Sequence, residues 1–240
     1  MKKLVMFALY IGIIGLAAGC GGDDDKNPAG PLPGGNITGM SGKAENWNLG
    51  TGKKVYFSMP VSSTQDVVFG SSDIAEDGSF SIQIQEPTAE YMMPLASYVD
   101  ENNCQSGVVI SDSSARCSYA QLNVAEGNSF IGYIDRTNSY YESDSVGAFY
   151  AMFIYADKNV TISGVDTCMW DNGITGVGAY NVVLAKGWNQ VAVTTTFFNS
   201  EEYHVTYSAG EPAGAKYIYF NYGSGLSKMS GIKRPAFLKR

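Results

Sequence analysis

Apolar and polar residues alternate in short runs from about residue 36 to residue 222. Within 79–85, Phe80, Ile82 and Ile84 fall on one side of a strand and the polar residues between them fall on the other. Glycine, asparagine, aspartate and serine interrupt the apolar runs, as is typical of turns between strands. No stretch shows the longer period of an amphipathic helix. The pattern therefore predicts an all-β fold of two antiparallel β-sandwich-like regions that follow a disordered tether.

The expected strands fall into two groups along the chain. The first group contains the segments 36–41, 53–59, 66–70 and 79–85. The second group contains 119–124, 129–134, 147–155, 159–166, 178–185, 188–198, 203–209 and 216–222. Lys186-Gly187 has the composition of a two-residue hairpin turn between two strands of the second group. We therefore expect a small β-sandwich over 36–95, a second one over 96–223 and a C-terminal tail at 224–240.

The N-terminus has the pattern of an export signal. Lys2 and Lys3 precede an uncharged, mostly apolar run over 4–18. A membrane-spanning helix needs about 20 apolar residues, so this run is too short for a stable anchor. It ends in Leu-Ala-Ala-Gly before Cys20, which resembles the lipobox of bacterial lipoproteins. The resemblance implies that 1–19 is removed and that Cys20 receives a diacylglyceryl group and an acyl chain such as palmitate; an ordinary secretory signal beside a chance cysteine is the alternative.

A polar segment separates this signal from the first expected strand. Residues 20–35 are rich in glycine, proline and aspartate and contain almost no apolar side chains, so we expect a flexible tether. Asp23, Asp24 and Asp25 follow closely after Cys20 and are similar to the surface-export signal of lipoproteins in the Bacteroidota. The two resemblances together imply a protein that lipid anchors in the outer membrane, with exposure at the cell surface.

The first expected sandwich has its own family resemblance. It begins with Ile37-Thr38-Gly39, continues with Trp47 and contains Asp-Gly-Ser-Phe within 76–82. In this arrangement it resembles carboxypeptidase regulatory-like and transthyretin-like modules. The resemblance implies a small β-sandwich with a structural or adhesive role rather than a catalytic one.

The cysteines that remain after Cys20 fit an oxidising compartment. Cys104, Cys117 and Cys168 permit three different single pairings. Cys104 and Cys117 bracket a polar loop, and a bridge between them would stabilise the fold by roughly 3 kcal/mol. We therefore expect the pair Cys104–Cys117 and a buried, reduced Cys168.

Charge and residue types narrow the function classes. The chain has a formal net charge of −7, which disfavours nucleic-acid partners. Its one histidine, His204, excludes a two-histidine zinc motif, and no Gly-x-Ser-x-Gly sequence accompanies it. A calcium-loop pattern that begins at Asp73 fails because Ala75 and Ile84 stand where oxygen ligands are needed. We therefore expect no cofactor, no metal and no catalytic residue, and we expect a protein that is not an enzyme.

Aromatic residues are the remaining indication of function, since the chain contains 16 tyrosines, 11 phenylalanines and 3 tryptophans. Tyr140, Tyr141 and Trp170 lie among polar residues and are the candidate ligand-binding rings, although β-sheets also use such rings for packing. The sequence favours a non-catalytic binding or structural role at the envelope. The partners expected are the membrane, through the lipid, and a glycan or another envelope protein. A glycan-binding module is the first alternative, and a carboxylate-dependent carbohydrate hydrolase is the second.

Overall fold

The computed structural model describes residues 35–61, 66–98, 104–140, 145–169 and 173–222. The following predictions lie outside these ranges: the signal at 1–19, the lipidated Cys20, nearly all of the tether at 20–35, Tyr141, Trp170 and the tail at 224–240. All described residues belong to one compact unit. Within the described ranges, no helix combines the length and the apolar character needed to cross a membrane.

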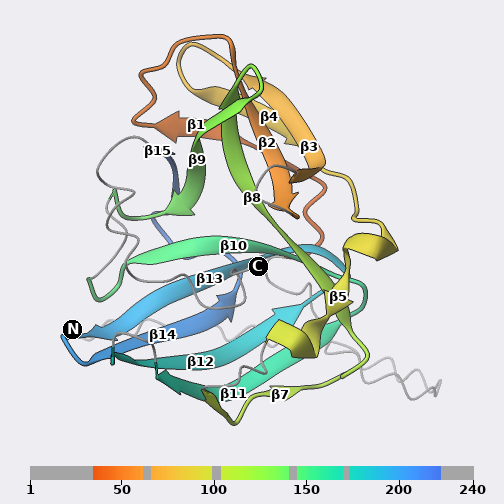
Figure 1. The fold of residues 1–240 in the computed structure, drawn as a ribbon, viewed down its shortest axis with the longest axis vertical. Helices are drawn as coiled ribbons and strands as arrows, with labels where there is room; N and C mark the ends of the chain where they lie inside the picture. Colours follow the sequence, from red (N-terminus) through yellow and green to blue (C-terminus); the bar gives the residue numbers. More distant parts are fainter. Residues whose placement is uncertain (1–34, 62–65, 99–103, 141–144, 170–172, 223–240) are drawn as a thin grey trace, which may run out of the picture. The chain divides into compact units, whose positions relative to one another are not determined.

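The described chain is all β, as the alternating pattern predicted. The strands are β1 Gly39–Glu45, β2 Lys53–Pro60, β3 Asp66–Ile74, β4 Ser79–Gln83, β5 Met93–Pro94, β6 Cys104–Ser106, β7 Val109–Ile110, β8 Arg116–Glu126, β9 Ser129–Thr137, β10 Phe149–Ala156, β11 Val160–Met169, β12 Thr175–Leu184, β13 Gly187–Phe198, β14 Glu202–Ala209 and β15 Lys216–Asn221. Two short 3₁₀ helices, η1 Ala89–Tyr91 and η2 Leu95–Tyr98, are the helical elements of the described residues. Figure 1 shows how these elements follow one another along the chain.

The strands form one hydrogen-bonded sheet in which most neighbours are antiparallel. Its main path runs β4-β1-β15-β9-β8-β10-β13-β14-β12-β11-β6, and β2 joins it by pairing with β8. Two pairs are parallel, β1 with β15 and β12 with β14. Strands expected in separate regions therefore pair with each other, since β1 lies beside the last strand and β2 lies beside β8.

The expected hairpin at Lys186-Gly187 is wrong. Strand β13 follows this turn but pairs with β10 and β14, and the β13–β14 pair lies between β10 and β12. The chain does bend at Lys186, and Gly187 has a φ of 109°, a backbone conformation that glycine adopts easily. The side-chain oxygen of Asn159 accepts a hydrogen bond from the Lys186 amide, and Trp188 is buried in the core, which directs β13 toward β10.

Strand β8 connects two groups of strands within this sheet. Its beginning, from Cys117 to Ala120, pairs with β10, and its end, from Gln121 to Glu126, pairs with β2. The strands β1, β4, β3, β2, β8, β9 and β15 then surround a core, since the Gln85 amide donates to the Phe69 carbonyl at 2.8 Å and so links β3 to the segment after β4. We call these seven strands the strand ring. Each of them consequently has an inner face toward the core and an outer face.

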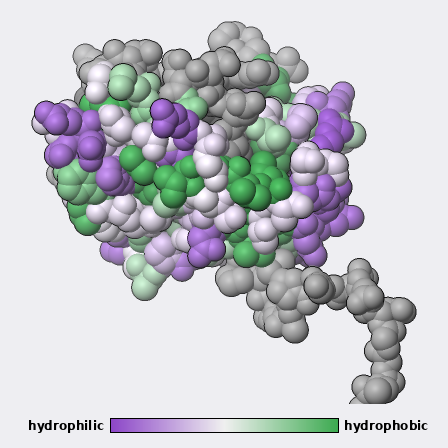
Figure 2. Space-filling model, turned by 90° about the horizontal axis from the view of Figure 1, so that it is seen from below, coloured by the Kyte–Doolittle hydropathy of each residue, from purple (hydrophilic) through white to green (hydrophobic). Residues whose placement is uncertain are grey.

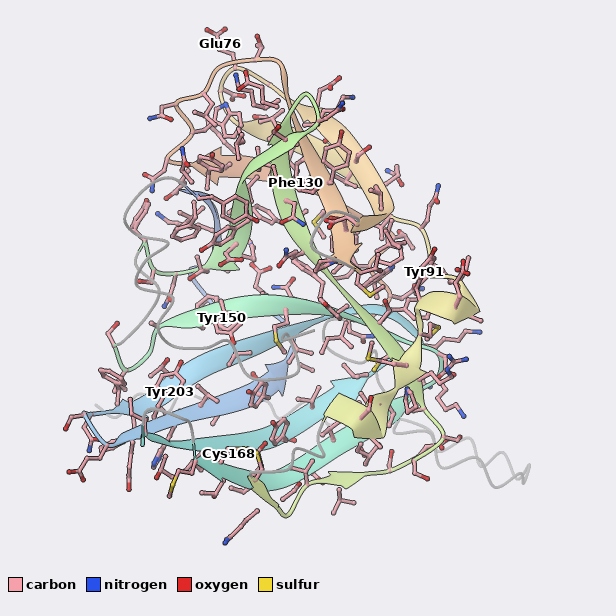
Figure 3. The ribbon with its side chains drawn as sticks, in the orientation of Figure 1. Glu76, Tyr91, Phe130, Tyr150, Cys168 and Tyr203 are labelled. Carbon is pink, nitrogen blue, oxygen red and sulfur yellow. A yellow bond between two sulfur atoms is a disulfide. The ribbon has the colours of Figure 1, made fainter. Side chains whose placement is uncertain are left out.

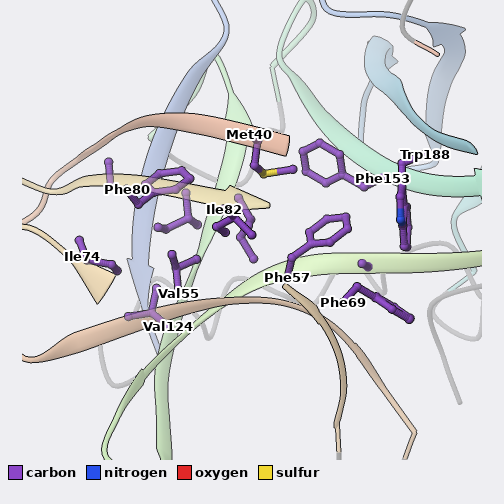
Figure 4. Close-up of a cluster of buried hydrophobic side chains, with 14 of the residues drawn as sticks. Met40, Val55, Phe57, Phe69, Ile74, Phe80, Ile82, Val124, Phe153 and Trp188 are labelled. Atoms are coloured by element: carbon purple, nitrogen blue, oxygen red, sulfur yellow. The ribbon is translucent and has the colours of Figure 1, made fainter. Parts of the chain in front are cut away.

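The core of the strand ring also contains residues from β10 and β13, which are not part of the ring. Phe57 of β2 is fully buried, and its ring contacts Phe153 of β10 and Trp188 of β13 at centroid distances of 5.5 and 4.8 Å. Figure 4 shows these rings packed together with Phe69. The Trp188 indole N–H donates to the Gln85 carbonyl at 2.8 Å, so the one polar group of this ring is satisfied.

The disulfide joins Cys104 to Cys168, so the expected Cys104–Cys117 bridge is wrong. Cys104 of β6 lies directly opposite Cys168 of β11 in an antiparallel pair, with a Cα–Cα distance of 4.1 Å. Cys117 lies on β8 opposite Met93 and is buried as a free thiol. The sequence placed Cys104 and Cys117 close together along the chain, but the pairing of β6 with β11 decides which sulfurs meet.

Candidate functional site

A row of side chains crosses four strands on the outer face of the strand ring. Tyr56 of β2 pairs with Asn123 of β8, Asn123 with Tyr133 of β9, and Tyr133 with Phe220 of β15. The alternate residues of the same strands, such as Phe57 and the neighbours of Asn123, enter the core. Because side chains alternate between the two faces of a strand, this row faces away from that core.

Aromatic rings dominate the row and its surroundings. Tyr133 stacks on Phe220 at a centroid distance of 5.2 Å and contacts Tyr222 at 5.7 Å. Tyr56 of β2, on the other side of β8, meets Phe130 of β9 edge-on at 6.1 Å. Phe130 and Tyr222 remain 44% and 45% exposed, so each offers a large apolar surface to solvent. Figure 3 labels Phe130 at the start of β9.

A buried amide lies among these rings. Asn123 is only 3% exposed, and its Nδ2 donates to Ser58 Oγ at 3.0 Å and to Asp66 Oδ2 at 3.1 Å. Its Oδ1 accepts from Gln121 Nε2 at 3.0 Å and from the Tyr222 hydroxyl at 3.3 Å. The amide therefore holds a carboxylate on one side and a phenol on the other in fixed positions.

We call this surface the aromatic–amide face. It consists of Tyr56, Asp66, Gln121, Phe130 and Tyr222, together with Ser58, Asn123, Tyr133 and Phe220, whose side chains are buried. A β-bulge between Val124 and Ala125 changes the register between β8 and β9, and it sets Phe130 opposite Ala125 on the same face. Exposed rings beside fixed hydrogen-bonding groups match the composition of a small-ligand site.

Sequence reasoning did not identify these residues, although part of the signal was present. Tyr56 and Ser58 share one side of β2, and Gln121 and Asn123 share one side of β8, so aromatic and amide positions could be assigned to the side opposite the apolar residues. The missing information was that β2, β8, β9 and β15 are neighbours, which brings these positions together.

Of the three candidate ligand-binding rings predicted from the sequence, Tyr140 lies within the described residues. It is 41% exposed, as expected, and its hydroxyl donates to Glu45 of β1. Glu45 also pairs with Lys216 at 3.1 Å. The hydrogen bond from Tyr140 is the main cause that lowers the pKa of Glu45, and the same bond raises the pKa of Tyr140. Tyr140 therefore contacts β1 and the start of β15, whereas Tyr222 follows the end of β15. Tyr141 and Trp170 lie outside the described residues.

His204 lies on β14 at the surface. Its Nε2 is 3.1 Å from Glu202 Oε2, and its ring packs beside Phe197 at 5.0 Å. These contacts involve no hydroxyl or thiol nucleophile. Within the described ranges, no group of histidine, cysteine, aspartate and glutamate has a geometry that could hold a metal ion.

A second carboxylate cluster lies on β11, β12 and β14. The Tyr180 hydroxyl donates to Asp166 Oδ2 at 2.9 Å, and the Tyr180 ring stacks on Tyr207 at 4.4 Å. Burial raises the pKa of Asp166 although the hydrogen bond from Tyr180 opposes the change. Gly178 leaves room for this arrangement, because a Cβ there would lie 2.3 Å from Asp166 Oδ1. The cluster packs the sheet internally and presents no open binding surface of exposed rings.

Two other surfaces differ from the aromatic–amide face in their chemistry. A shallow hollow of about 270 Å³ lies over β1 and β4 and is lined by Thr38, Gly39, Met40, Ser41, Ser81, Ile82 and Gln83. It contains neither an ionisable group nor an aromatic ring. The end of the sheet near β7 and β11 exposes Val109 and Val165, and Figure 2 shows hydrophobic residues in separate groups along the middle of the face seen from below. The aromatic–amide face combines exposed rings with fixed polar groups, which neither of these surfaces does.

No family model matches this chain, and no curated protein and no solved structure is significantly similar to it. Function therefore has to follow from the geometry and chemistry of the chain itself.

Proposed function

We propose that this chain is a non-catalytic saccharide-binding lipoprotein of the bacterial outer membrane, and that the aromatic–amide face holds the saccharide. The N-terminal signal and Cys20 support the anchor, because they resemble the lipobox of lipoproteins. The observation that carries the binding role is the pair of exposed rings, Phe130 and Tyr222, on the same face as the buried Asn123 amide, to which the Tyr222 hydroxyl donates.

The chemistry of this face suits a sugar. The C–H faces of a pyranose pack on aromatic rings, and aromatic rings give a large contact area at a low cost in conformational entropy. Hydroxyl groups of the sugar then need donors and acceptors whose positions are fixed. Gln121 and Asp66 are held by hydrogen bonds to the buried Asn123 amide, and Asp66 also accepts from Ser58, so these two side chains need little further ordering when a sugar binds.

Binding without catalysis fits the groups present. Glycoside hydrolysis needs two carboxyl groups at a set distance on either side of the scissile bond. In the aromatic–amide face, Asp66 is the one carboxylate, and its Oδ2 accepts hydrogen bonds from Ser58 and Asn123. The face is therefore suited to holding a sugar rather than to cleaving it.

The test is a glycan array probed with the full chain in detergent micelles, followed by titration of the best ligand. The double variant Phe130→Ala/Tyr222→Ala should weaken binding at least tenfold, because exposed aromatic rings dominate binding sites of this kind. Phe197→Ala is the matched control, since Phe197 is also about 40% exposed but lies on β13 outside the face. Equal loss in both variants, or no glycan bound by the wild type, would contradict the proposal and favour a purely structural role.

A further inference from the structure

The aromatic–amide face carries a negative charge at its polar end. Asp66 Oδ2 accepts from Ser58 Oγ at 2.7 Å and from Asn123 Nδ2 at 3.1 Å. Within the described residues, the other carboxylate oxygen of Asp66 accepts no hydrogen bond. The carboxylate therefore offers one acceptor of fixed position, separated from the Tyr222 phenol by the width of the Asn123 side chain.

The lysines of β2 do not neutralise this carboxylate. Lys54, on the same side of β2 as Tyr56, pairs with Asp73 at 3.0 Å. Lys53 pairs with Glu126 at 3.1 Å. The whole chain carries a formal net charge of −7, so the long-range field has the same sign as the local one.

From this charge pattern we infer that the aromatic–amide face selects uncharged saccharides and rejects acidic ones, and that Asp66 is the residue that makes the distinction. The inference rests on the proposed saccharide-binding function and adds the class of ligand. A neutral sugar stacked on Tyr222 donates a hydroxyl to Asp66, and such a charge-assisted hydrogen bond is stronger than a neutral one. A uronic acid, a sialic acid or a sugar phosphate instead meets a like charge in a partly desolvated position.

The experiment compares neutral and acidic oligosaccharides of equal length. The full chain in detergent micelles is titrated with mannohexaose, cellohexaose and xylohexaose, and with the hexamers of mannuronate and galacturonate. Wild type should bind at least one neutral hexamer ten times or more tightly than either acidic one. Raising the ionic strength should strengthen any residual binding of the acidic hexamers and leave neutral binding unchanged, because salt screens the repulsion.

The substitution Asp66→Asn removes the negative charge but keeps nearly the same side-chain shape, so it tests the charge alone. Binding of the neutral hexamer should fall about tenfold, because a hydrogen bond to a charged acceptor is lost, and binding of the acidic hexamers should rise. Glu76→Gln makes the same change in net charge at an exposed turn, labelled in Figure 3, and should alter neither affinity. The melting temperature of each variant shows whether it is folded.

The outcomes separate the two proposals. If acidic hexamers bind as well as neutral ones, or if Asp66→Asn leaves the preference unchanged, the inference about charge is wrong. The saccharide-binding function would still stand in that case, provided that Phe130→Ala/Tyr222→Ala abolishes the binding. If no hexamer of either class binds, the inference about charge is wrong, and if no array glycan binds either, both proposals are wrong.

Discussion

The ring of Phe57 packs edge-on against the ring of Trp188 at a centroid distance of 4.8 Å. Phe57 comes from the first expected region of the chain and Trp188 from the second, so the two regions share a core. Phe57→Ala should lower the free energy of unfolding by about 3–5 kcal/mol, because it leaves a cavity among buried rings. Denaturant unfolding of wild type followed by tryptophan fluorescence and by far-UV circular dichroism should give one coincident transition.

Two separate transitions in wild type would contradict this shared core. Val61→Ala is a useful control for the variant, since Val61 follows β2 and is exposed. Its effect on stability should stay within about 0.5 kcal/mol.

Sequence periodicity predicted much of the fold, because the period of two is a local property of each strand. The expected segments 53–59 and 188–198 correspond closely to β2 and β13. The short strands β5, β6 and β7 were missed, since two or three residues cannot show a period. The order of strands could not be predicted, because it depends on which surfaces pack together in space. The disulfide and the aromatic–amide face both depend on that order.

The disulfide between Cys104 and Cys168 is expected to matter for stability. It closes a loop with a sequence separation of 64 residues, for which the chain-entropy model gives about 4 kcal/mol. The variant Cys104→Ala/Cys168→Ala should therefore unfold at a clearly lower denaturant concentration than wild type. Peptide mapping without reduction should find the Cys104–Cys168 linkage, and a linkage of Cys117 to either residue would show that the strand pairing is different.

Cys117 should resist alkylation in the folded protein. Burial raises the pKa of its thiol to about 12, with a smaller contribution from the nearby Asp157 carboxylate. At pH 8 the reactive thiolate is consequently scarce, and the sulfur is also shielded from reagents. Iodoacetamide should label Cys117 only after denaturation. Labelling of the native protein at the rate of a free thiol would mean that this part of β8 opens readily.

Asp166 should make the protein less stable as the pH rises. Burial raises its pKa in the folded state above the ordinary value of 3.8, so the folded state binds its proton more tightly than the unfolded state does. Stability is then greatest below the unfolded pKa and falls as the pH passes through the folded pKa. Asp166→Asn should remove this loss. The melting temperature of the variant relative to wild type should increase between pH 3 and pH 7, and a difference that does not depend on pH would contradict the assignment.

The proposed lipidation of Cys20 predicts how the protein partitions between detergent and water. Cys20→Ser removes the thiol that would carry the proposed diacylglyceryl group. Wild type should enter the detergent phase in a phase-separation assay, and the variant should enter the aqueous phase. A variant that stays in the detergent phase after its signal has been removed would contradict lipidation at Cys20.

The buried Asn123 amide should be sensitive to an added negative charge. Asn123→Asp would place a second carboxyl group where Nδ2 now donates to Asp66 Oδ2 at 3.1 Å. Two carboxylates so close together cannot both be ionised at low cost, so the pKa of one of them must rise. The variant should therefore be strongly destabilised at neutral pH and should recover stability as the pH falls toward about 4. Asn123→Ala separates the lost hydrogen bonds from the added charge, because its cost of about 1–3 kcal/mol should not depend on pH between 5 and 8. Equal pH profiles for Asn123→Asp and Asn123→Ala would show that Asp66 is not held against residue 123.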